Sequence, residues 1–252
     1  MSVVLELWHW LTVSAQWHGQ GDIPDRLLQH VWYSALSVTC AALIALPLGL
    51  LVGHTGRGGF VVINIANTAR ALPSVGILIL VVLTVGIGLA PVLIALVALA
   101  VPPILVNTYA GVRAVEREVK DAARGMGMTG WQVLLRVEVP LALPLMLLGL
   151  RIAAVQVVST ATIAAYVSLG GLGRFIFDGL ATENYQMVIG GAALVAALAV
   201  VVEALFLLAD RVFVSPGVQS GRGNSSGGAK ISAAQKVVVT PTPISPHEGS
   251  LA

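Results

Sequence analysis

The chain alternates between long apolar runs and short polar segments. No Asp, Glu, Lys or Arg occurs between Arg26 and Arg57, and none occurs in residues 71–112. About 20 apolar residues are enough for an α-helix to cross the hydrocarbon core of a bilayer. A single helix over 71–112 would be about 63 Å long, which is twice the thickness of that core. The pattern therefore predicts two membrane spans in this part of the chain.

Five spans account for all the apolar runs, and we expect them at 29–52, 61–85, 91–110, 141–169 and 187–209. Pro73 is expected to kink the second span, because proline lacks the N–H that a helix interior requires. The predicted fold class is therefore all-α, a polytopic transmembrane helical bundle with five core spans. No internal repeat is visible, and five spans do not divide into the equal halves of inverted-repeat carriers.

The two ends of the chain differ from this bundle. Residues 1–26 carry three tryptophans and few charges, which favours an external, interfacial amphipathic helix over a disordered terminus. Residues 213–252 are rich in Gly, Ser, Pro, Thr and Ala, and such a composition predicts a disordered tail. Residues 27–212 are then the transmembrane domain.

Composition agrees with a lipid-embedded protein. Hydrophobic residues make up 57% of the chain and charged residues 10%, whereas soluble domains carry about 25% charged residues. The single cysteine, Cys40, lies in an apolar run and cannot form a disulfide within the chain. No Cys/His cluster has the spacing of metal ligands, so we expect no metal site in this chain. We also expect no cofactor in this chain and no nucleic-acid partner.

The polar segment 111–139 separates the third and fourth expected spans. Good helix formers occupy 116–126 and are followed by Gly127, which predicts a short helix with a glycine stop. Thr129 with Gln132 three residues later is typical of a capping box that starts a second helix. A helix–turn–helix unit of this kind is suited to a groove in a partner protein. The alternative is an ordinary basic loop.

This segment resembles the EAA loop of ATP-binding cassette (ABC) importer permeases, which reads Glu-Ala-Ala, three residues, Gly, nine residues, Ile, one residue, Leu-Pro. The matching positions, with three conservative departures, are Asp121, Ala122, Ala123, Gly127, Val137, Val139 and Pro140. Four further segments are similar to the glycine betaine/carnitine/choline permeases of that family: 71–74, 107–111, 161–165 and 170–173. The resemblance extends over about residues 27–210.

The resemblance implies a permease subunit of the cell membrane with several partners. These are two cytoplasmic ATP-binding subunits, a second permease (in a homo- or heterodimer) and an extracytoplasmic solute-binding protein. ATP and Mg²⁺ would bind the partner ATPase, because this chain contains no Gly-x4-Gly-Lys-Ser/Thr phosphate loop. The chain would thus be a transport subunit and not an enzyme by itself.

The resemblance also implies roles for residues of segment 111–139, which would be the coupling loop. Ala122 and Ala123 would allow close approach to the ATPase, Gly127 would permit the turn, and Asp121 would make a charged contact. Val137 and Pro140 complete the motif.

The resemblance implies a small compatible solute as substrate, such as glycine betaine, carnitine, choline or a proline-like compound. Another small solute, for example an amino acid, is the alternative. A stand-alone channel or secondary carrier is a more remote one.

The polar residues within the spans are candidates for the translocation path, and the alternative is that they hold helices together. The candidates are Asn67, Ser74, Asn107, Gln156, Ser159 and Thr160. Arg151 lies about 10 Å beyond Pro144 along a helix and is expected to snorkel to the cytoplasmic interface or to face a cavity. On the external side, Gly170, Gly171 and Gly173 form a candidate loop or gate where the binding protein would dock.

The distribution of Lys and Arg predicts the orientation. With five spans, Arg57, the five basic residues of 111–139 and those of the tail fall on one side, and only Arg26 and Arg174 fall on the other. Cytoplasmic segments carry an excess of Lys and Arg. The coupling loop and the C-terminus are therefore expected in the cytoplasm and the N-terminus outside.

Overall fold

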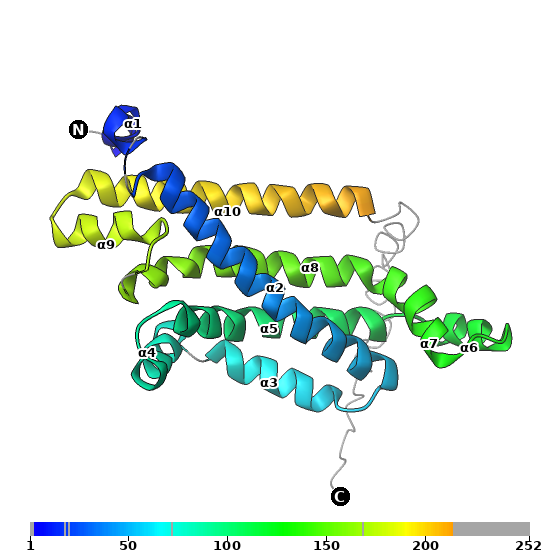
Figure 1. Cartoon of the computed structure of the whole chain (residues 1–252). Helices are drawn as coiled ribbons and strands as arrows, with labels where there is room; N and C mark the ends of the chain where they lie inside the picture. Colours follow the sequence, from blue (N-terminus) through cyan, green and yellow to red (C-terminus); the bar gives the residue numbers. More distant parts are fainter. Residues whose placement is uncertain (1–2, 18, 20, 72, 168, 214–252) are drawn as a thin grey trace, which may run out of the picture. The chain divides into compact units, whose positions relative to one another are not determined.

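The computed structural model describes residues 3–17, 19, 21–71, 73–167 and 169–213, and all regular structure in these residues is helical, as expected (Figure 1). The long helices are α2 (Ile23–Thr55), α5 (Leu89–Arg113), α8 (Val139–Thr160) and α10 (Tyr185–Phe213). The shorter α-helices are α1 (Val3–Thr12), α3 (Gly59–Ala71), α4 (Ser74–Val85), α6 (Arg117–Gly125), α7 (Gly130–Val133) and α9 (Gly173–Ala181). The other turns are the 3-10 helices η1 (Ser14–Gln16) and η3 (Ala161–Val167) and the π-helical η2 (Leu134–Glu138).

Four helical stretches of the described residues are long and apolar enough to cross a membrane: Ile23–Thr55, Leu89–Arg113, Gly130–Val167 and Tyr185–Val212. They correspond to four of the five expected spans.

The remaining expected span, 61–85, is divided into α3 and α4. Pro73 precedes α4 with an extended backbone, φ −70° and ψ 120°, so the expected kink is a break in the helix. Their lengths of 13 and 12 residues are each too short to cross a membrane alone. In Figure 1, α3 runs back from the end of α2, and α4 lies at the opposite end of the bundle. The two helices together therefore return the chain from one end to the other.

The helices α2, α5 and α8 pack closely because small side chains line their contacts. The buried face of α2 repeats a small residue at every fourth position: Ser37, Ala41, Ala45, Gly49 and Gly53. A Cβ atom added at Gly49 would lie 2.7 Å from Thr108 Cβ, and one at Gly53 would lie 2.7 Å from Val112 Cβ. Small residues at such spacing let helix backbones approach closely within membranes.

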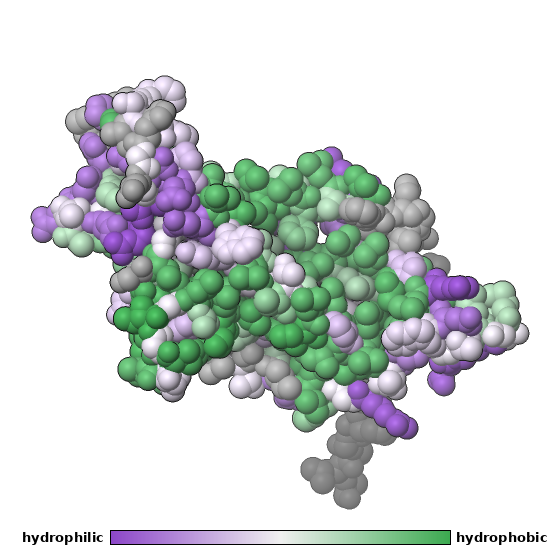
Figure 2. Space-filling view, viewed as in Figure 1, coloured by the Kyte–Doolittle hydropathy of each residue, from purple (hydrophilic) through white to green (hydrophobic). Residues whose placement is uncertain are grey.

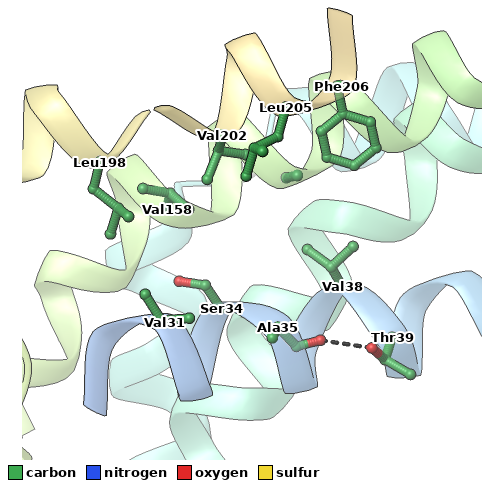
Figure 3. Close-up of a pocket in the computed structure, with 11 residues that line it drawn as sticks. Val31, Ser34, Ala35, Val38, Thr39, Val158, Leu198, Val202, Leu205 and Phe206 are labelled. Carbon is green, nitrogen blue, oxygen red and sulfur yellow. Dashed lines mark hydrogen bonds between the residues drawn. The ribbon is translucent and has the colours of Figure 1, made fainter. Parts of the chain in front are cut away.

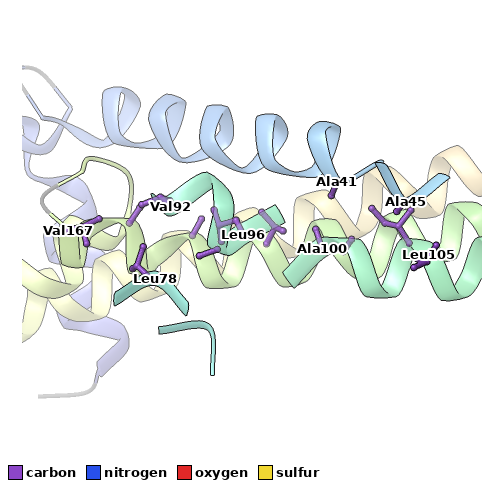
Figure 4. Packing of buried hydrophobic residues seen from close by; sticks show 14 of the residues in the cluster. Ala41, Ala45, Leu78, Val92, Leu96, Ala100, Leu105 and Val167 are labelled. Atoms are coloured by element: carbon purple, nitrogen blue, oxygen red, sulfur yellow. The ribbon is translucent and has the colours of Figure 1, made fainter. Parts of the chain in front are cut away.

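The largest buried cluster connects α4 to this group of three helices (Figure 4). Leu78 of α4 packs with Val92 and Leu96 of α5, and Ala41 of α2 belongs to the same cluster. The buried side chains of this cluster are all aliphatic, so apolar packing holds α4 to the bundle even though the chain is broken before it.

The N-terminal residues form the helix expected there, but one of its tryptophans does not face outward. Trp10 is buried and contacts Phe175 edge to face, with the ring centroids 5.4 Å apart, whereas Trp8 and Trp17 are exposed. Trp10 therefore anchors α1 to α9, and only the other two tryptophans remain available for a membrane interface. The expected tail, 213–252, lies almost entirely outside the described residues.

The surface separates into an apolar middle and two polar ends (Figure 2). Hydrophobic residues cover the central parts of the helices, while hydrophilic residues gather around α1 and α9 at one end and around α6 and α7 at the other. This division places the two groups of candidate site residues at opposite ends of the bundle. One group is the coupling loop, and the other is the loop of Gly170, Gly171 and Gly173, here called the glycine loop.

Candidate functional site

The coupling loop has the helix–turn–helix structure that its sequence predicts. Helix α6 ends at Gly125, and Gly127 adopts a left-handed φ of +85°, which glycine tolerates without steric strain. The capping box is present: Thr129 N donates to Gln132 Oε1 at 2.8 Å, and Gln132 N donates to Thr129 Oγ1 at 3.4 Å. The reversal between α6 and α7 is therefore fixed by backbone chemistry local to the loop.

The motif residues differ in their exposure. Asp121, Ala122 and Gly127 are exposed, whereas Ala123 is buried within the chain itself. Asp121 forms an ion pair with Arg124 on the same helix, at 3.4 Å. Of the two alanines, only Ala122 has an exposed side chain, and Ala123 packs inside the chain. Val137 is half-buried and Pro140 is exposed.

Met126 and Trp131 are the two most exposed large apolar side chains of the loop, and neither was singled out from the sequence. Met126 is 73% exposed and Trp131 is 62% exposed, and they flank the turn at Gly127. Aromatic and Met side chains are enriched at protein interfaces, so this pair is a candidate contact surface. Their occurrence inside a charged, glycine-rich loop was the signal that would have identified them.

The loop is tied to the bundle through a buried carboxylate that the sequence alone did not single out. Glu138 is 1% exposed, and its Oε2 lies 2.6 Å from His54 Nδ1. Its Oε1 lies 3.1 Å from Lys120 Nζ, which also donates to the carbonyl oxygen of Val112 at 3.0 Å. This triad of His54, Lys120 and Glu138 joins the ends of α2 and α5 to α6 and η2.

The coupling loop continues into the fourth span without a break. The structure has one helical stretch from Gly130 to Val167, in which η2 is a wider π turn between α7 and α8. The sequence placed the start of this span near residue 141, after the polar segment. The helices α7, η2 and α8 therefore connect the coupling loop to the membrane-spanning helix with no loop between them.

The structure brings two of the candidate path residues together. Gln156 and Ser159 line one groove of about 430 Å³ on α8, which also contains Arg151 of α8 and Glu203 of α10. Arg151 Nη2 donates a hydrogen bond to Glu203 Oε1, and the pair bridges the two helices. The sequence did not predict this partner for Arg151.

The other path candidates lie apart from this groove. Asn107 Nδ2 donates to the carbonyl oxygen of Pro103 on its own helix, at 2.8 Å, and it packs where Gly149 brings α8 close. Thr160 is half-buried, and Ser74 begins α4. The Asn67 side chain lies outside the described residues. For Asn107, the geometry agrees with the alternative role in helix packing.

A second groove, of about 280 Å³, lies between α2, α8 and α10 and is apolar (Figure 3). Val31 and Val38 of α2 face Val202 and Leu205 of α10 across it. The Thr39 hydroxyl donates to the Ala35 carbonyl of its own helix at 2.7 Å. Such a lining suits hydrocarbon chains and offers no charged group to a polar solute.

The glycine loop at the opposite end is clamped by α2. Gln29 Oε1 accepts a hydrogen bond from Gly171 N at 3.0 Å. His30 Nδ1 accepts one from Leu172 N at 3.3 Å, and His30 Nε2 lies 2.9 Å from the Val158 carbonyl oxygen.

The three glycines of this loop are required by close packing and backbone conformation. A Cβ atom at Gly170 would overlap Gln29 Oε1, and one at Gly173 would overlap the Thr162 carbonyl oxygen. Gly171 has a left-handed φ of +89°. The loop is thus held in one position against α2 and the end of α8.

Comparisons with known proteins agree with this architecture. The family described as the binding-protein-dependent transport system inner membrane component matches residues 45–215, and the chain belongs to this family. It is the membrane-spanning permease subunit of an ABC importer, a multi-pass membrane protein that works in a complex with ATPase subunits.

Two relatives illustrate the similarity within the family. The glycine betaine/carnitine/choline transport system permease protein OpuCB of Bacillus subtilis (strain 168) is 33% identical over 199 residues, covering 79% of this chain and 92% of the relative. The carnitine transport permease protein OpuCB of Listeria monocytogenes is 39% identical over 175 residues, covering 69% of this chain and 80% of the relative.

Solved structures show the same fold. The MetNI methionine ABC transporter, in inward-facing conformations, contains a chain with a TM-score of 0.64 at 24% identity, covering 73% of this chain and 94% of that one. An amino acid ABC transporter gives a TM-score of 0.62 at 20% identity, covering 74% of this chain and 92% of that one.

Proposed function

We propose that this permease imports a small compatible solute of the glycine betaine, carnitine or choline type. The support comes from two relatives that are 33% and 39% identical to this chain over most of its length. One is named as a glycine betaine/carnitine/choline permease and the other as a carnitine permease. The solved structures of methionine and amino acid transporters, at 20–24% identity, show the shared fold and give no support to the amino acid alternative. Uptake of labelled glycine betaine by cells that lack their own osmolyte importers, with amino acids as competitors, separates the two.

The observation that carries the proposed coupling mechanism is that α6 and α7 expose a contact surface while the buried triad holds them to the bundle. Ala122, Met126 and Trp131 of this unit are exposed, and they would occupy a groove of a cytoplasmic ATP-binding subunit. Asp121 would make a charged contact beside them. ATP and Mg²⁺ would be bound by that partner.

Movement of the docked unit would reach the spans by two routes. One is the continuous helix from α7 through η2 to α8, and the other is the triad, which links α6 to the ends of α2 and α5. Closure of the ATPase subunits around ATP would then shift the spans between inward-open and outward-open states, since nucleotide binding favours one of two arrangements.

The proposed orientation follows the charges at the two ends of the bundle. Arg57, Arg113 and the basic residues of α6 lie at the end that carries the coupling loop, and Arg26 and Arg174 lie at the other. The coupling loop would face the cytoplasm. The glycine loop would face outward, where an extracytoplasmic solute-binding protein would dock against it. A second permease would complete the translocation path beside α8 and α10.

The coupling role is tested by changing the exposed surface and not the buried anchor. We expect Trp131→Ala to lower solute uptake at least tenfold and to release the ATPase subunits during purification, because an aromatic anchor dominates a protein interface. The matched control is Leu83→Ala, which removes an exposed apolar side chain from α4 and should leave uptake unchanged. Normal uptake and normal co-purification of the Trp131→Ala variant would contradict the docking surface.

A further inference from the structure

An ion pair and two polar side chains share one groove on the surface of two membrane-spanning helices. Arg151, Gln156 and Ser159 come from one face of α8, and Glu203 comes from α10. We propose that this groove is a binding subsite for zwitterionic solutes, in which Arg151 takes the carboxylate and Glu203 the ammonium group. The proposal rests on the proposed function and extends it by selecting zwitterions over simple cations.

The depth of the two charges is the first reason. Arg151 is twelve residues from the start of α8, about 18 Å along the helix, and Glu203 is ten residues from the end of α10, about 15 Å. Both lie within the helical stretches that are long and apolar enough to cross a membrane, Gly130–Val167 and Tyr185–Val212. Ionised side chains at this depth face a protein interior or a water-filled cavity, not lipid.

The partial exposure of the pair is the second reason. The side chains of Arg151 and Glu203 are 26% and 35% exposed, so the chain alone does not enclose them. The face that carries them is therefore turned toward an aqueous path or toward another protein subunit. The interface between two permease subunits would provide both surroundings, because it contains the second subunit and encloses the aqueous translocation path.

The other lining groups suit a small polar solute. The Gln156 amide offers both donors and an acceptor, and the Ser159 hydroxyl donates to the Val155 carbonyl at 3.0 Å, which leaves its oxygen free to accept. The volume, about 430 Å³, lies within the range of about 300–1,000 Å³ that is usual for small-molecule pockets. The apolar groove between α2 and α10 has the hydroxyls of Ser34 and Thr39 but no charged or amide side chain.

Charge balance explains why a zwitterion is preferred. In the empty groove Arg151 pairs with Glu203, and Asp210 is a second carboxylate close enough to act on it. A zwitterion offers a partner to Arg151 and to Glu203 at once and leaves the net charge of the groove unchanged, and Arg151 can bind its carboxylate with two hydrogen bonds. A cation such as choline offers no carboxylate to Arg151, so it gains the contact with Glu203 alone. The groove should therefore bind glycine betaine or carnitine better than choline.

The experiment measures binding of radiolabelled glycine betaine, with choline as competitor, to the permease in complex with its ATPase subunits in lipid nanodiscs. We expect saturable betaine binding in the original protein, with choline competing at least tenfold more weakly. Arg151→Gln should weaken betaine binding at least tenfold and abolish the preference over choline, because the carboxylate loses its partner. Thr84→Val, which removes an exposed hydroxyl from α4, is the control and should change neither value.

A charge exchange distinguishes a ligand site from a structural pair. The double variant Arg151→Glu/Glu203→Arg keeps the ion pair, so thermal stability should be retained. Betaine binding by the double variant should nevertheless be at least tenfold weaker than binding by the original protein, because the two ends of the solute would be reversed relative to Gln156 and Ser159.

The subsite is overturned if this double variant binds betaine as the original protein does, if the original protein binds no betaine, or if choline competes equally. Solute uptake and ATP hydrolysis by the original complex test the permease function separately, and they can be normal when the subsite proposal fails.

Discussion

At the scale of single residues, the buried carboxylate of Glu138 is the most informative feature of the chain. It accepts from Lys120 and lies beside His54, so a side chain of the coupling loop and one from the end of α2 meet on one acid group. Removing one partner of a buried ion pair is strongly destabilising, by about 3–5 kcal/mol, because an unpaired charge remains. Stability alone therefore does not reveal what such a group does.

We predict that the double variant Lys120→Met/Glu138→Leu separates the two effects. Replacing both charges by apolar side chains is often neutral for stability, so the melting temperature of the purified complex should change little. Transport should nevertheless become inefficient, with several times more ATP hydrolysed for each solute molecule imported, because α6 is no longer tied to α2. An unchanged ratio of hydrolysis to uptake would show that the triad has no part in coupling.

At the scale of helices, close packing of α2 on α5 holds the bundle together. The glycines at 49 and 53 leave no room for a larger side chain. We predict that Gly53→Leu forces the helices apart and lowers stability by about 1–3 kcal/mol, which corresponds to several degrees in melting temperature. The measurement is thermal unfolding of the purified complex. Gly88→Ala, where an added Cβ meets no atom within 4 Å, should melt as the original protein does, and equal melting of both variants would refute the packing argument.

Periodicity and local chemistry were sufficient to predict most helices and the form of the coupling loop. The capping box of Thr129 and Gln132 and the turn at Gly127 depend on neighbouring residues only, and the structure confirms both. The break before α4 was underestimated, because the pattern marks where proline disturbs a helix but not whether packing restores it. The partners of Glu138 and Arg151 were not predictable, since His54 and Glu203 are distant in sequence and meet only when the helices pack.

At the scale of the whole molecule, the described residues form a helical bundle with two polar ends, and we assign a different function to each end. The end with the coupling loop would receive force from an ATPase, and the glycine loop at the other end would receive solute from a binding protein. Gln29 and His30 fix that glycine loop against α2.

We predict that Gln29→Ala reduces uptake severalfold while the ATPase subunits remain bound, because the change removes one of the two side chains that hold the glycine loop and leaves the coupling loop untouched. Uptake assays together with co-purification of the ATPase subunits would check this, and loss of the ATPase subunits would contradict the division between the two ends.

The central claim is that α6 and α7 face the cytoplasm and touch an ATPase subunit. It is tested most directly in a Cys40→Ala background, which removes the single native cysteine, by introducing Ala122→Cys and applying a membrane-impermeant thiol reagent. The account predicts labelling in inside-out vesicles, no labelling in intact cells, and protection when the ATPase subunits are bound. Labelling of residue 122 in intact cells would contradict it.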